Sequence, residues 1–120
     1  MISNIINLFS SDFRLKNFLY KELKKKSKKQ SKISVLDIGS SDFSRIQSFN
    51  IKNLELTLFD IKFFNGKNND GTRKIIGNVL NIENFFKENE FDVVVALDLI
   101  EHIEKDDGKK LINKLIKISK

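Results

Sequence analysis

Two apolar segments of the chain deliver acidic side chains to positions where a ligand can bind. The first reads Val35-Leu-Asp-Ile-Gly-Ser-Ser-Asp42, and the second reads Phe91-Asp-Val-Val-Val-Ala-Leu-Asp-Leu-Ile-Glu-His-Ile103. Short apolar runs of this kind predict strands that are buried on both faces of a parallel sheet. Ligands bind at the carboxyl ends of such strands, so the two segments together predict one cofactor crevice.

The turn after the first segment favours a nucleoside or nucleotide ligand. Gly39 lets the backbone approach a ligand closely, and the helix expected after it presents free N–H groups. A dinucleotide fingerprint would need Gly at positions 39, 41 and 44, whereas the chain has Ser41 and Ser44. Asp37 adds a fixed negative charge that points into the crevice, where it favours a cationic ligand and opposes a phosphate. The turn therefore argues against a dinucleotide.

A second acidic position follows at the end of the next predicted strand. Asp60 lies 21 positions after Gly39. An acidic side chain there can accept hydrogen bonds from both ribose hydroxyls, in dinucleotide and nucleoside sites alike. Asp is also common in turns, so the sequence leaves open that Asp60 merely ends a strand.

Strand and helix patterns alternate along the chain from residue 33 onward. This alternation predicts an α/β fold with a parallel sheet and right-handed crossovers. Asn81 is expected to cap one of the helices. The predicted strands cover 33–38, 54–59, 74–76 and 91–97, and the predicted helices cover 41–49, 81–88 and 105–120.

An amphipathic helix is predicted from about residue 12 into the lysines at 24–29, with most of its apolar residues on one face. We expect this face to pack against the sheet; a lid or a partner surface is the alternative. The chain therefore divides into a basic helical segment, 1–32, and a partial α/β domain, 33–120. The apolar residues of the helix are Phe13, Leu15, Phe18, Leu19 and Leu23.

The net charge of +6 is concentrated in the N-terminal segment. Residues 1–32 hold nine Lys and Arg against two acids, whereas residues 33–120 hold thirteen against fourteen. The lysines at 24–29 could contact a polyanion such as a nucleic acid. We favour a solvated helix end, because no aromatic residues interleave with these lysines to stack on bases.

The composition excludes or disfavours several kinds of site and of location. Cys is absent, so disulfides and thiolate chemistry are excluded, and His102 is the one His, which does not favour a metal site. No apolar run approaches the ~18 residues of a membrane span. A cytoplasmic location is the expectation.

Four motifs of the chain resemble those of the class I S-adenosylmethionine-dependent methyltransferases. Residues 35–42 look like the first motif of that family, and residues 91–103 are similar to the fourth-strand motif of its small-molecule branch. Between them, Leu56-Thr-Leu-Phe-Asp60 resembles the second strand with its acidic end, and Gly77-Asn-Val-Leu80 resembles the adenine-side motif. The order and spacing match, over about residues 33–120. The chain departs from the pattern at Ser41 and Phe43, where the family usually has Gly.

The resemblance implies S-adenosylmethionine as the cofactor and a role for each matching residue. The methionine part would lie against Asp37, Gly39, Ser40 and Ser41. The nucleoside part would meet Asp60 at the ribose, with Ile61, Asn78 and Val79 around the adenine, and Asp98 would lie near the reactive methyl group.

No catalytic residue is assigned from the sequence. Glu101 and His102 could act as an acid and base pair, but both types are also common at the start of a helix, which is the interpretation we favour. Methyl transfer itself needs mainly alignment of the nucleophile with the methyl group and exclusion of water.

The resemblance implies a Rossmann-like domain that is incomplete, with about four strands in the order 3-2-1-4. The fourth strand would then be an apolar edge that a partner chain could cover. The expected function is methyl transfer to a small-molecule, lipid or saccharide acceptor, with this chain supplying the cofactor-binding half. Two alternatives remain: a truncated or degenerate domain that acts as a non-enzymatic interaction module, and a subunit of an RNA methyltransferase.

Overall fold

The computed structural model of the protein describes residues 5–6, 13–64, 72–96, 99 and 103–120. Its described strands form one parallel sheet in the order β1-β5-β2-β3-β4. The strands are β1 (Ile5–Ile6), β2 (Ile33–Ile38), β3 (Leu54–Asp60), β4 (Arg73–Ile76) and β5 (Val93–Val95). The α-helices are α1 (Phe13–Ser27) and α2 (Lys105–Ile118), and two short 3-10 helices are η1 (Ile46–Phe49) and η2 (Val79–Asn84).

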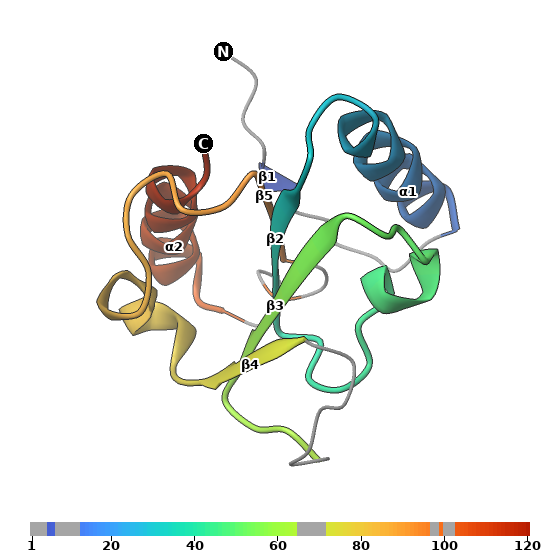
Figure 1. The fold of residues 1–120 in the computed structure, drawn as a ribbon. Coiled ribbons are helices and arrows are strands. Elements are labelled where there is room, and N and C mark those ends of the chain that lie inside the picture. The colour runs from blue at the N-terminus through green and yellow to red at the C-terminus, as the bar shows by residue number, and fades with distance from the viewer. Residues whose placement is uncertain (1–4, 7–12, 65–71, 97–98, 100–102) are drawn as a thin grey trace.

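The sheet separates two layers of helices. In Figure 1, α1 and η1 lie on one side of the strands, and α2 and η2 lie on the other. The order β4-β3-β2-β5 within this sheet is the predicted 3-2-1-4 arrangement, so the predicted topology is confirmed. Val35 pairs with Leu56 on one side and with Val93 on the other, which makes β2 a central strand.

The outer edge of β5 differs from the prediction of an open fourth strand. Ile5 and Ile6 of β1 pair in parallel with Val94 and Val95, so this edge is covered by the N-terminal part of the same chain. The strand is also shorter than predicted. Phe91 lies before it and forms an isolated bridge with Ser119, and residue 97 lies outside the described part of the chain.

Two predicted helices are replaced by 3-10 helices. Within the segment 41–49 only η1 is helical. Ser41 has a left-handed φ of 51°, and its hydroxyl bonds to the carbonyl of Lys62 in the loop after β3, so the first residues of the segment do not form a helix. The segment 81–88 is replaced by η2, which starts earlier. Its cap is Asn78, whose side-chain oxygen accepts a hydrogen bond from the Leu80 N–H, and the predicted cap Asn81 lies inside it.

Each face of the sheet carries its own apolar core. Alternation along β2 sends Val35 to the α1 side and Leu36 to the α2 side. Leu19 and Leu23 of α1 are fully buried on the first side, as expected for a helix that packs on the sheet. On the second side α2 contributes three buried residues, Leu111, Leu115 and Ile118. None of the helices in the described ranges is long and apolar enough to cross a membrane.

Candidate cofactor site

A cavity of about 170 Å³ lies at the carboxyl ends of β2, β3 and β4. This is the edge where parallel α/β sheets bind ligands. Five residues that the sequence singled out, Gly39, Asp60, Ile61, Asn78 and Val79, come together in its wall although they derive from three separate segments. The remaining lining residues are Ile38, Phe59, Gly77 and Leu99.

Two glycines keep the cavity open. Gly39 has a φ of 87°, which favours Gly, and its N–H donates to the carbonyl of Phe59 across the two strands. A Cβ on Gly77 would lie 2.5 Å from the ring of Phe85 and 2.8 Å from that of Phe59. Gly77 is therefore the residue that allows these rings to pack edge to face beside the cavity.

Asp60 ends β3 at the wall of the cavity and is partly exposed. Its Oδ1 accepts a hydrogen bond of 2.7 Å from the N–H of Ile61, and its backbone carbonyl accepts one from Gly77. These contacts fix the carboxylate beside an exposed Ile61. An acceptor next to an apolar surface suits a ligand with hydroxyl groups and a flat ring.

Asp37 does not line the cavity, and its charge is not the fixed one expected from the sequence. The side chain is fully buried, and its Oδ2 accepts hydrogen bonds from the hydroxyls of Ser40 at 2.9 Å and Ser44 at 2.5 Å. Its Oδ1 is buried and has no hydrogen-bond partner among the described residues. This carboxylate therefore shapes the loop over it.

Burial is the main cause that raises the pKa of Asp37 to about 6. The hydroxyls of Ser44 and Ser40 oppose this rise because they stabilise the ionised form. The charge of Asp60 raises the pKa further, and that of Arg45 lowers it. Burial thus moves the pKa of Asp37 from the acid range toward neutral pH.

The two predicted serines hold the loop rather than the cavity. Ser40 bonds to Asp37, and the Ser41 hydroxyl donates to the carbonyl of Lys62 at 2.8 Å. Phe43, which stands where the resembled family usually has Gly, points outward with 73% of its surface exposed and contacts the ring of Phe64. Its bulk is therefore directed away from the cavity.

Sequence reasoning missed an ion pair between Asp42 and Lys74, which joins the loop after β2 to β4. The two residues are 32 positions apart. The one signal available was a Lys within an otherwise apolar predicted strand. Asp98, Glu101 and His102 lie outside the described residues.

The chain is similar to known proteins in structure but not in sequence. No protein-family model matches the chain, and no curated protein is similar to it in sequence. Solved structures do match it. WbdD superposes with a TM-score of 0.70 at 17% identity, over 89% of this chain and 27% of its own length.

Two further structures extend the match. A protein from Galdieria sulphuraria described as a sarcosine dimethylglycine methyltransferase has a TM-score of 0.67 at 18% identity, over 89% of this chain and 43% of its own. A SAM-dependent methyltransferase from Archaeoglobus fulgidus has a TM-score of 0.61 at 16% identity, over 88% of this chain and 48% of its own. The chain thus spans about a quarter to a half of these proteins. It has part of the Rossmann-like fold of the class I S-adenosylmethionine-dependent methyltransferases.

Proposed function

We propose that the chain binds S-adenosylmethionine at the carboxyl edge of its sheet and serves methyl transfer to a small-molecule, lipid or saccharide acceptor. The observation that carries the proposal is the convergence of Gly39, Asp60, Ile61, Asn78 and Val79 on one cavity. These positions match the family's motifs, and the fold is the same.

The cavity suits the nucleoside end of the cofactor. Its volume of about 170 Å³ is below the roughly 300 to 1,000 Å³ of complete ligand pockets. Asp60 would accept hydrogen bonds from the ribose hydroxyls, while Ile61 and Val79 would cover the faces of the adenine. The side-chain carbonyl of Asn78 already caps η2 through Leu80, and its second lone pair can accept a hydrogen bond from the adenine amino group.

Methyl transfer would then follow from alignment. The bound cofactor supplies a methyl group on a sulfonium, which is already activated for attack. The chain's own part is to hold the nucleoside end at Asp60 and to keep the loop after β2 close to the strand ends. A rigid loop lowers the entropy that must be lost when the reacting groups meet.

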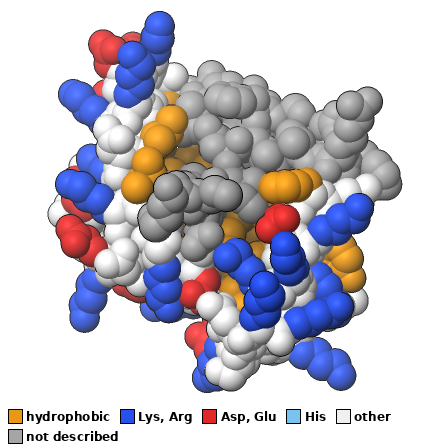
Figure 2. Space-filling model, turned by 90° about the horizontal axis from the view of Figure 1, so that it is seen from above, with side chains coloured by type: hydrophobic (Ala, Val, Ile, Leu, Met, Phe, Trp, Pro, Cys, Tyr) orange, Lys and Arg blue, Asp and Glu red, His pale blue; other side chains and the backbone are white. Residues whose placement is uncertain are grey.

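A nucleic-acid acceptor has weaker support. Lys24, Lys25, Lys28 and Lys29 are exposed at the end of α1. This end lies where β2 begins, opposite the edge that carries the cavity. Figure 2 looks at that end and shows Lys and Arg side chains gathered at the lower right with few Asp or Glu among them, while both signs are mixed on the left. The basic side chains therefore lie away from the cavity, where an acceptor would have to meet the cofactor.

Calorimetry with S-adenosylmethionine tests the proposal. We expect saturable binding that becomes about 10- to 100-fold weaker in Asp60→Ala, because hydrogen bonds to a charged group contribute about 1.5 to 3 kcal/mol. Glu55→Ala is the matched control, since Glu55 is an exposed acid near the other end of β3 and pairs only on the surface with Lys32. Absence of binding by the wild type at millimolar cofactor would overturn the proposal. Binding without methyl transfer to any acceptor would favour an interaction module.

A further inference from the structure

Asp42 joins three segments of the chain near the carboxyl ends of β2 and β3. The residue lies in the loop after β2, and its side chain is only 6% exposed. Its Oδ1 lies 2.6 Å from Nζ of Lys74 in β4. Its Oδ2 accepts a hydrogen bond from the N–H of Phe64, in the loop after β3. One carboxylate therefore links the loops that follow β2 and β3 with the first half of β4.

Additional contacts run between the same segments. The hydroxyl of Ser41 donates to the carbonyl of Lys62, which links the two loops a second time. The Lys74 ammonium lies 5.6 Å from the centre of the Phe63 ring, within the range of a cation–π contact. With a side chain 17% exposed, Lys74 is largely shielded from water, so its attraction to Asp42 is little screened.

These three segments are also the ones that build the cavity. The loop after β2 begins at Gly39, the loop after β3 begins at Ile61, and β4 leads directly into Gly77. Neither Asp42 nor Lys74 lines the cavity. A change in their distance would move the walls relative to one another without removing any lining side chain.

We propose that Lys74 is a positioning residue for the cofactor cavity, which acts through Asp42 to hold its three walls at the spacing that the ligand needs. The inference rests on the proposed function, since it names S-adenosylmethionine as the ligand. Loss of the ammonium removes the charge that holds the largely buried Asp42 carboxylate in place, and it weakens the hold of this carboxylate on the Phe64 N–H. Both loops lose their common anchor.

Calorimetry on matched variants measures this role. Lys74→Met keeps the length of the side chain and removes its charge, and we expect it to weaken S-adenosylmethionine binding about tenfold. Lys74→Arg should restore most of the affinity. Arg73→Met is the control, because Arg73 is the neighbouring residue of β4 and its pair with Glu90 lies at the opposite end of the sheet. Asp42→Asn should weaken binding as Lys74→Met does, and the double variant should be no worse than either.

Hydrogen exchange of the Phe64 amide gives a readout that needs no ligand. We expect this amide to exchange about tenfold faster in Lys74→Met and in Asp42→Asn, and at the wild-type rate in Arg73→Met. Wild-type affinity in a folded Lys74→Met variant would overturn the inference, and so would equal affinity losses in Lys74→Met and Arg73→Met. If the wild type binds no cofactor, the proposed function fails. Faster exchange in Lys74→Met and Asp42→Asn, but not in Arg73→Met, would then still support the anchoring of the two loops by the ion pair.

Discussion

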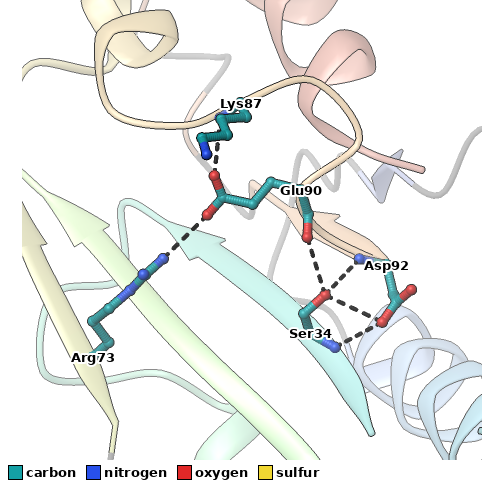
Figure 3. A network of polar contacts seen from close by, with 5 residues as sticks. All are labelled: Ser34, Arg73, Lys87, Glu90 and Asp92. Carbon is teal, nitrogen blue, oxygen red and sulfur yellow. Dashed lines mark hydrogen bonds and ion pairs between the residues drawn. The ribbon is translucent and has the colours of Figure 1, made fainter.

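Two buried acids at opposite ends of the sheet differ in their hydrogen-bond partners and in the direction in which folding shifts their pKa. Asp92 lies just before β5 and is 7% exposed, whereas Asp37 lies near the carboxyl end of β2 and is fully buried. Both oxygens of Asp92 have partners. Its Oδ2 accepts from the backbone N–H and the hydroxyl of Ser34 (Figure 3), and its Oδ1 lies 3.2 Å from Nζ of Lys120. Among the described residues, only one oxygen of Asp37 has partners.

The surroundings of the two acids extend this difference. Figure 3 shows that Glu90 continues the network of Asp92, because it bonds to Arg73 of β4 and to the backbone of Lys87, while its carbonyl accepts from Ser34. Burial raises the pKa of Asp92, but the backbone N–H of Ser34 and the ammonium of Lys120 together hold it below its usual value. This end is organised for stability.

At the carboxyl end, Oδ1 of Asp37 is buried with no hydrogen-bond partner among the described residues. A buried carboxylate oxygen that lacks a partner destabilises the ionised form in the folded state. The raised pKa of Asp37 expresses the same imbalance. The comparison teaches that the two ends of one sheet can be told apart by whether their buried charges are satisfied.

Removal of Asp92 should have the largest effect. Asp92→Ala removes the side-chain acceptor of the Ser34 N–H, leaves the Ser34 hydroxyl with its longer bond to the Glu90 carbonyl, and breaks the pair with Lys120. We expect the free energy of unfolding, measured by urea denaturation at neutral pH, to fall by about 4 kcal/mol. The lowered pKa means that the ionised form stabilises the fold above the usual pKa of Asp and stops doing so as the pH falls through the folded value, so the loss should shrink in acid.

Cofactor affinity separates this effect from one on the site. Well below its melting temperature, Asp92→Ala should bind S-adenosylmethionine as the wild type does, since Asp92 does not line the cavity. A large loss of affinity under conditions where the variant is fully folded would mean that the two ends of the sheet are coupled, and Asp92 would then affect the site as well as the stability.

The pH dependence of stability that Asp37 contributes should have the opposite sign from that of Asp92. Its pKa rises from 3.8 to about 6 on folding, so the folded state binds the proton more tightly and loses stability as the pH rises through this range. Asp37→Asn lacks this titration. From about pH 4.5 to about pH 7.5, the stability of the variant should therefore gain about 2 kcal/mol relative to the wild type, in parallel urea denaturations. A constant difference over this range would show that Asp37 does not titrate on folding.

The predictable part of the molecule follows from local patterns. The parallel sheet came from the alternation of apolar runs with turns, whereas the strand order was implied by the resemblance to the methyltransferase family. Gly39 and Asp60 were singled out because each follows a predicted strand at a spacing typical of a nucleoside site. The environment of Asp37 was not accessible in this way. Its identity suggests a charge, whereas its behaviour depends on two serines of the following loop and on complete burial.

The partners of Asp42 were equally hidden. No local pattern joins Asp42 to Lys74, because the contact exists only after β2, β3 and β4 have assembled. The helix prediction was also wrong for residues 40–44, because the side chains of Ser41 and Ser44 make hydrogen bonds to Lys62 and Asp37 in place of a local helix. The sequence thus predicts which residue types lie at the site, but their hydrogen-bond partners and protonation depend on tertiary contacts that it does not reveal.

Ser44 offers the finest test of the comparison, because it changes the surroundings of Asp37 and leaves the acid in place. The Ser44 hydroxyl favours the ionised form, so Ser44→Ala should raise the pKa of Asp37 further. The free energy of unfolding should fall by about 1 kcal/mol above the pKa of Asp37 and by less in acid, where a protonated carboxyl needs the hydroxyl less. Ser48→Ala is the control, since its exposed hydroxyl bonds only to the carbonyl of Arg45 and should show no such pH dependence. Equal losses above and below the pKa of Asp37 would mean that the Ser44 hydroxyl does not favour the ionised form, and the buried charge at this end of the sheet would then not depend on the loop serines.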